Sequence, residues 1–257
     1  TSPVVQQSEL KDLVTGNSKF AFELYHAVRE KSTNLFYSPF SISTALAMTY
    51  AGARGQTERQ MADTLDFTLP QNKLHPAFNA LHLKLAGRDP RAESRDDEGF
   101  RLHVVDAIWG QTGYSFLPQF LDLLAENYGA GLRLLDFEKE PEPSRAVMNR
   151  WVSRETEGRI RDLLPQGSID PLTRLVLTDA IYFKAKWLYE FEKRATRPGP
   201  FRLLDGKEIT VDMMSQTKEF GYAEGEGYQA VELPYLGGKL TMVVFLPRQG
   251  RFRGFEG

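Results

Sequence analysis

Cysteine is absent from the 257-residue sequence, and this absence removes three kinds of chemistry at once. The chain can form no disulfide, no thiol nucleophile and no zinc site built on cysteine. Its compartment stays open, because a chain of this length can bury a sufficient core without covalent cross-links. Histidine is scarce, and no two histidines show the zinc-motif spacing of four residues with a glutamate between them; they stand at His26, His75, His82 and His103. We therefore expect neither a metal nor a cofactor.

A large excess of one charge is also missing, since 32 Lys and Arg residues stand against 34 Asp and Glu residues, for a net charge of −2. Proteins that bind nucleic acid gather a basic excess on one face, so we expect no nucleic-acid partner. The uncharged stretch at residues 32–53 contains eight Ser, Thr or Asn residues and Pro39, whereas a membrane span needs about 20 mostly apolar residues. We expect this stretch to form a buried helix, and we expect no membrane partner.

Catalytic and cofactor motifs are missing or stand in the wrong context. No G-x-S-x-G sequence is present, so an α/β-hydrolase nucleophile has no candidate. Residues 225–230 satisfy G-x-G-x-x-A, but strand-like residues follow where a dinucleotide site needs a helix, and we predict a hairpin instead. Residues 52–57 lack the lysine and the spacing of a phosphate loop. The sequence offers no catalytic or cofactor-binding residue, and a small-molecule hydrolase or dehydrogenase is only a distant alternative.

The composition, with 41% hydrophobic and 26% charged residues, is that of an ordinary globular protein. Hydrophobic periodicity predicts mostly helices early and strands late without βαβ alternation, which indicates the α+β class. Helices are expected at 17–31, 39–51, 57–65, 74–85, 117–127 and 144–164, and strands at 101–109, 132–137, 175–187, 201–204, 217–222, 230–235 and 240–246. The charged stretch at 88–98 is expected to be a solvated loop. With no repeat and no linker, residues 1–257 are expected to form one domain.

Two segments have patterns that place them in the core. Ser38 is a suitable N-cap, and Pro39 suits the first position of the helix that follows. This helix has no charged face, so we expect neighbours to surround it. In the strand at 175–187, the residues on one face are Leu175, Leu177, Asp179, Ile181, Phe183 and Trp187. That face is apolar apart from Asp179, whose carboxylate needs a partner or a proton there.

Three blocks of sequence resemble the serpin family and occur in the family's order. The first lies at residues 34–57 and includes NLFYSPFSIS, ALAM and GARGQT. The second runs from NRWV at residue 149 through GRI to LTDAIYFKAKW, which ends at residue 187. The third, at residues 211–247, includes VDMM and the last two predicted strands. The resemblance implies a serpin-like α+β fold, with early helices packed around a large central, mostly antiparallel sheet and further strand-rich sheets.

The resemblance also implies an activity. Serpins inhibit serine proteases as suicide substrates: the protease cleaves an exposed reactive loop, which then inserts as an extra strand into the central sheet of a metastable fold. A serine protease is thus the expected partner, and the protein is not an enzyme. Most members of the family are secreted, and we expect a secreted protein that is a monomer when intact. A non-inhibitory serpin that acts as a carrier or chaperone is the alternative.

Serpin chains normally continue for roughly another third beyond residue 257, so the sequence resembles the first two thirds of a family member. The missing part would contain the reactive loop. The reactive-centre residue and the target protease are therefore unknown from this sequence.

Individual positions can be carried over from the family. Ser38, Pro39 and Ser41 match the shutter segment beneath the sheet, and Trp187 matches the breach tryptophan at its top. Residues 149–163 match the helix that lies across the sheet. Asp179 stands where the family usually has a shutter asparagine. We hypothesise that the hydroxyl of Ser38 or Ser41 donates a hydrogen bond to Asp179, together with a histidine beyond residue 257, and that loop insertion depends on pH.

Overall fold

The computed structural model describes residues 3–29, 34–85, 101–129 and 131–257, so the loop expected at 88–98 lies outside them. The chain divides into two compact units, the first built mainly from residues before Phe183 and the second mainly from Phe183–Gly257. Each unit is described separately, and the expectation of a single domain stays a prediction. Within the described ranges no helix is long and apolar enough to cross a membrane.

The first unit contains the helical part of the chain. Its helices are α1 (Gln7–Val28), α2 (Pro39–Tyr50), α3 (Gly55–Thr64), α4 (Gln71–Leu85), α5 (Pro118–Tyr128) and α6 (Pro141–Glu155). Helix α1 begins ten residues before the predicted start, because Gln6 and Glu9 form a capping box there. Helix α3 begins at Gly55, two residues before the predicted start at residue 57.

A three-stranded sheet crosses the first unit, in the order β2-β1-β3. It consists of β1 (Arg101–Gln111), β2 (Leu132–Leu135) and β3 (Leu175–Lys184). Strands β1 and β2 are parallel. Strands β1 and β3 run in opposite directions, because Gln111 N donates to Arg174 O (3.0 Å) while Thr178 Oγ1 donates to Ala107 O (3.5 Å). The described part of the sheet therefore contains one parallel and one antiparallel pair.

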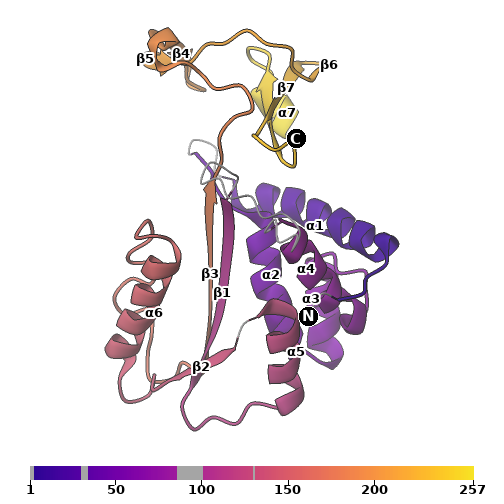
Figure 1. Ribbon diagram of the computed structural model, residues 1–257, viewed down its shortest axis with the longest axis vertical. Helices are drawn as coiled ribbons and strands as arrows, with labels where there is room; N and C mark the ends of the chain where they lie inside the picture. Colours follow the sequence, from indigo (N-terminus) through magenta and orange to yellow (C-terminus); the bar gives the residue numbers. More distant parts are fainter. Residues whose placement is uncertain (1–2, 30–33, 86–100, 130) are drawn as a thin grey trace. The chain divides into compact units, whose positions relative to one another are not determined.

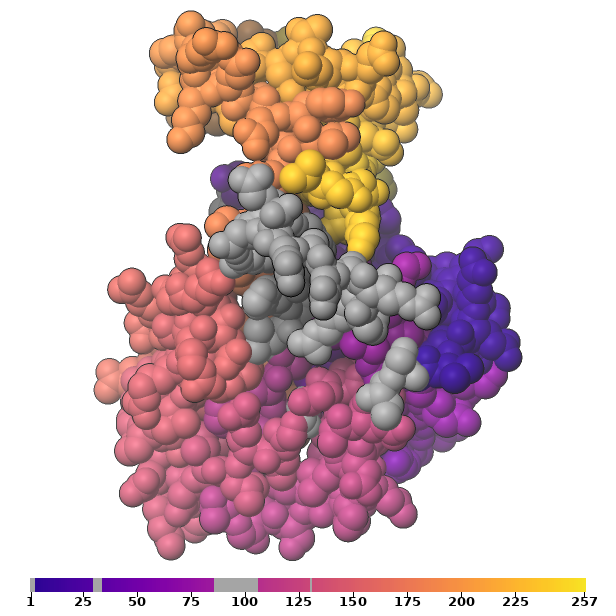
Figure 2. Space-filling model, in the orientation of Figure 1, coloured from indigo at the N-terminus to yellow at the C-terminus, as the bar shows by residue number. Residues whose placement is uncertain are grey.

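Helices cover both faces of this sheet, with α6 on one side of β1 and β3 and α2 on the other (Figure 1). On the α2 side, Met48 and Ala51 pack with Ile108 of β1 and with Leu175 and Leu177 of β3. On the α6 side, the packed side chains come from the intervening strand positions and from the helix: Ala107, Trp109, Ala180, Met148, Trp151 and Val152. The charge-free helix thus lies directly against the central strands, as its sequence predicts. In the space-filling view, α6 and its following segment form one flank of the first unit and α1 the other (Figure 2).

The second unit is rich in strands. It contains the hairpin β4 (Arg197–Arg202) and β5 (Glu208–Met213), then the antiparallel sheet β6 (Tyr222–Gly225), β7 (Tyr228–Pro234) and β8 (Thr241–Pro247), with η1 (Lys193–Ala195) and α7 (Phe252–Glu256). Gly227, with φ of +87°, lies in the turn between β6 and β7, so the G-x-G-x-x-A sequence forms the predicted hairpin. Gly237 and Gly238, both with positive φ, lie in the connection from β7 to β8. The strand expected at 217–222 is wrong except for its last residue.

Candidate functional site

The first turn of α2 begins the candidate site. Ser38 has an extended backbone, its Oγ accepts a hydrogen bond from Ser41 N (3.2 Å), and Pro39 follows as the first helical residue. The predicted N-cap is therefore confirmed. Ser41 and Ser43 are buried, with 4% and 0% of their surfaces exposed. By helical spacing, Ser41 lies on the stripe of α2 that carries Met48, which packs against the sheet.

Asp179 lies on the face of β3 that is turned toward α2, together with Leu175 and Leu177. On the neighbouring strand, Asp106 shares the α2 face with Ile108 by strand alternation. The two carboxyls are in hydrogen-bond contact. Burial raises the pKa of Asp106, and the contact with Asp179 raises it further. Burial also raises the pKa of Asp179, while the hydrogen bond with Asp106 lowers it, so Asp106 is the partner that holds the proton.

The structure adds partners of Asp179 to the two hydroxyl groups of the hypothesis. The Ser38 hydroxyl oxygen accepts a hydrogen bond from the backbone of α2. The Ser41 hydroxyl is close enough to lower the pKa of Asp179, but its Oγ makes no hydrogen bond of ordinary geometry within the described part of the chain. His82 of α4 also lowers the pKa of Asp179 through its charge. The main partner is Asp106, which sequence reasoning missed because it treated each strand face separately.

Three buried oxygen atoms on this side of the sheet lack a hydrogen-bond partner among the residues that the structure describes: Ser41 Oγ, Asp106 Oδ1 and Asp179 Oδ2. Most buried polar atoms in folded proteins are hydrogen-bonded, and each unpaired one costs about 1–3 kcal/mol. Hydrogen bonding between α2 and the sheet is therefore incomplete at the position that the resemblance assigns to the shutter.

The opposite face of the sheet is held by aromatic side chains. Trp109 of β1 and Trp151 of α6 meet edge to face, with ring centroids 5.5 Å apart. The Arg133 guanidinium of β2 lies over both rings, 5.4 Å and 5.2 Å from their centroids. Trp109 Nε1 donates a hydrogen bond to Thr178 Oγ1 of β3 (3.0 Å), which joins the two central strands.

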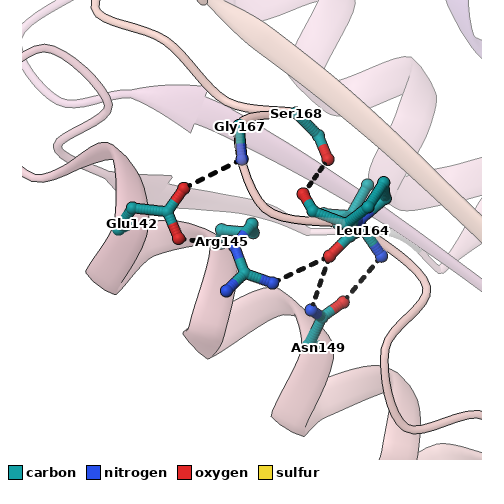
Figure 3. A network of polar contacts seen from close by, with 7 residues as sticks. Glu142, Arg145, Asn149, Leu164, Gly167 and Ser168 are labelled. Atoms are coloured by element: carbon teal, nitrogen blue, oxygen red, sulfur yellow. Dashed lines mark hydrogen bonds and ion pairs between the residues drawn. The ribbon is translucent and has the colours of Figure 1, made fainter.

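Polar contacts fasten the segment after α6 back onto the helix (Figure 3). Asn149 Nδ2 donates to Leu164 O, and Leu164 N donates to Asn149 Oδ1, both at 2.9 Å. Arg145 also donates to Leu164 O (2.8 Å) and to Glu142. Glu142 accepts from Gly167 N (3.1 Å) as well. We call the Glu142, Arg145 and Asn149 side chains, with Leu164, the α6 latch.

The helix predicted over 144–164 is wrong at both ends, since α6 begins at Pro141 and ends at Glu155. Glu157 and Gly158 have φ values of +51° and +74°, which reverse the chain. Of the segment 149–163 that the resemblance places across the sheet, only the part up to Glu155 is helical. The rest returns along α6, where the latch holds it.

Trp187 belongs to the second unit and not to β3, which ends at Lys184. The predicted strand over 175–187 is thus too long, and Trp187 does not share a strand face with Asp179. Its ring stacks on Tyr235, with centroids 4.5 Å apart and planes inclined by 11°. Two backbone bonds, Leu188 N to Pro234 O (2.9 Å) and Leu236 N to Lys186 O (2.8 Å), flank the stacked pair.

Comparison with known proteins settles the family. The family model described as Serpin (serine protease inhibitor) matches residues 15–257. The chain belongs to the serpin family. It is 39% identical to an uncharacterized serpin-like protein of Thermococcus kodakarensis over 99% of this chain and 57% of that protein. It is also 39% identical to the human leukocyte elastase inhibitor, over 93% of this chain and 62% of that protein.

Solved structures agree with this assignment and confirm the predicted α+β serpin fold. Emu ovalbumin superposes with a TM-score of 0.87 at 28% identity, covering 95% of this chain and 66% of that one. Cleaved kallistatin complexed with heparin superposes with a TM-score of 0.84 at 28% identity, covering 96% of this serpin chain and 71% of that one. The chain thus spans about 57–62% of the length of the curated relatives named above.

Proposed function

We propose that the protein is a serpin-type inhibitor of serine proteases that acts as a suicide substrate and not as an enzyme. The carrying observation is the position of β3, which pairs with β1 on one side in the described sheet and whose other side is where an inhibitory serpin takes up its cleaved loop. Helix α2 lies beneath that strand and α6 covers its opposite face. Similarity to the human leukocyte elastase inhibitor supports a serine protease as the partner.

A strand edge exposes unpaired backbone groups that can take up an extended segment. In an inhibitory serpin, the cleaved reactive loop fills this place and carries the acylated protease with it. The inserted loop converts unpaired edge groups into ladder hydrogen bonds, which supplies the driving force. We further propose that the protein is secreted, as most members of the family are, and that it is a monomer.

Incubation with serine proteases tests this function. The full-length protein that contains these residues is mixed with trypsin-, elastase- and subtilisin-like proteases, and the products are separated in SDS. We expect an SDS-resistant complex with at least one protease, and none when the active-site serine of the protease is blocked beforehand. Cleavage by every protease without any complex would overturn the proposal and favour the carrier or chaperone alternative.

A further inference from the structure

The Asp106–Asp179 contact joins two neighbouring strands at one level of the sheet. The bonds from Gln111 to Arg174 and from Thr178 to Ala107 set the register of β1 against β3. Continuing this antiparallel register by one residue places Asp106 opposite Asp179. Both side chains are turned toward α2, because they alternate with residues that pack against α6.

The surroundings of the pair contain little positive charge. Helix α2 carries no charged residue at all. Helix α4 contributes His82, whose charge lowers the pKa of Asp179. Helix α5 contributes the buried Tyr128 phenol, whose pKa is raised by burial and by the charge of Asp106. Two facing carboxylates in such a setting cannot both stay ionised, whereas a carboxylic acid donating to a carboxylate forms a strong hydrogen bond.

The Ser41 hydroxyl below the pair gives an independent sign that the cluster is incompletely bonded. Ser41 is more than nine-tenths buried, and its Oγ has no partner among the residues described. The Ser41 hydroxyl acts on Asp179 directly. A serine hydroxyl can donate its own hydrogen to a carboxylate, whereas two facing carboxyl groups can be joined only by a hydrogen that one of them carries.

We propose that Asp106 and Asp179 hold one proton between them at neutral pH, and that this proton bridges β1 and β3. The proton comes from solvent and returns to it, so no other reactant is involved. When it is lost, the two carboxylates repel each other across the antiparallel pair and the junction of β1 and β3 loosens. The bridge does not depend on the proposed inhibitory function, but its effect on loop insertion rests on that function.

The sign of the pH effect follows from linkage. In the folded state the pKa of both carboxyls is raised by burial above the value of about 4 for an unfolded aspartate. Between about pH 4 and the pKa of about 9 that Asp106 has in the folded protein, the pair therefore binds more protons in the folded than in the unfolded chain, and its contribution to stability is lost as the pH rises through that range. His75 acts in the opposite direction and only below its ordinary pKa of 6.5. Measurements above that pH thus separate the two groups.

Infrared difference spectroscopy observes the proton directly. The full-length protein is labelled with carboxyl-¹³C aspartate, and the C=O band of a protonated carboxyl is followed from neutral to alkaline pH. We expect this band at neutral pH, and we expect it to disappear as the pH rises. The wild-type spectrum needs no variant, so misfolding of a mutant cannot hide the result. Absence of the band at neutral pH would overturn the proposal.

Variants then assign the band and its effect. Asp106→Asn should remove the band, and Asp122→Asn, at an exposed position on α5, should leave it unchanged. Between pH 6.5 and 9, the thermal unfolding midpoint of the wild type should fall more steeply than that of Asp106→Asn/Asp179→Asn. Equal slopes would overturn the proposal. A midpoint raised by added Na⁺ or Ca²⁺ with no protonated band would show that a cation, not a proton, joins the pair.

The inhibitory function is scored separately. Protease complex formation with the wild type at neutral pH reports on the function whatever the infrared result. If complexes form, their rate should depend on pH in the wild type more than in the double variant. If the wild type and the double variant had identical rate–pH profiles and the infrared band were present, the proton bridge would be supported but its influence on loop insertion would be refuted.

Discussion

The two faces of the central sheet are held in different ways. On the α6 face, paired indole rings, a guanidinium and the α6 latch supply specific contacts between the helix, the sheet and the segment that follows the helix. On the α2 face, Ser41 and two acids leave three buried oxygens without a hydrogen-bond partner among the described residues. The α6 face is thus fixed by specific contacts, while the α2 face carries unfavourable polar burial.

The largest expected effect is on the α6 face, at Trp151. Its side chain is 7% exposed and contacts Trp109 and Arg133. Trp151→Ala should lower the free energy of unfolding by about 3–5 kcal/mol, because it leaves a large cavity. Trp151→Phe should cost much less, since Trp151 Nε1 has no hydrogen-bond partner in the described structure to lose. Urea unfolding measures both, and equal losses would show that packing is not what holds α6.

Acid should weaken the helical layer on the α2 side through His75. This side chain packs against Tyr50 of α2, and its Nδ1 is 2.6 Å from Tyr128 Oη. Burial, aided by the charge of Arg54, lowers its pKa to about 4. The unfolded chain therefore binds the extra proton first, and the contribution of His75 to stability should fall as the pH drops from 6.5 toward 4, by up to about 3 kcal/mol. His75→Gln should flatten that slope in urea unfolding at several pH values.

Removing the α6 latch should have an intermediate effect. Asn149→Ala deletes both hydrogen bonds with Leu164 and leaves the Leu164 N–H without this partner. The free energy of unfolding should fall by about 2–3 kcal/mol. Hydrogen exchange should accelerate in the segment after α6. Arg150→Ala, at the next and exposed position of the helix, is the matched control and should change neither quantity. Equal exchange in both variants would mean that the latch does not hold the segment.

The smallest effect is expected at the start of α2. Ser38→Ala removes the N-cap hydrogen bond to Ser41 N and should cost about 1 kcal/mol, whereas Ser38→Asn should retain most of the stability. Thermal unfolding distinguishes the two variants. If the two variants had the same thermal unfolding midpoint, helix capping would not be the role of Ser38.

Strand alternation and the lack of charge on α2 predicted which residues of β3 face that helix and that α2 lies against the sheet. Those properties depend on local periodicity, which the sequence displays. The Asp106–Asp179 contact was missed because it depends on the register between strands separated by about 70 residues, which no local pattern reveals. The end of α6 was missed because Glu157 adopts a left-handed conformation that non-glycine residues seldom take.

The positions of the indoles give the molecule its own optical reporters. Of the three tryptophans, Trp109 and Trp151 lie at the junction of α6 with the sheet beneath one cation, and Trp187 is stacked on a tyrosine in the other unit. Displacement of α6 would separate the first two rings from each other and from Arg133, and their fluorescence would change. Replacing Trp187 with phenylalanine would leave an emission signal that follows this helix alone.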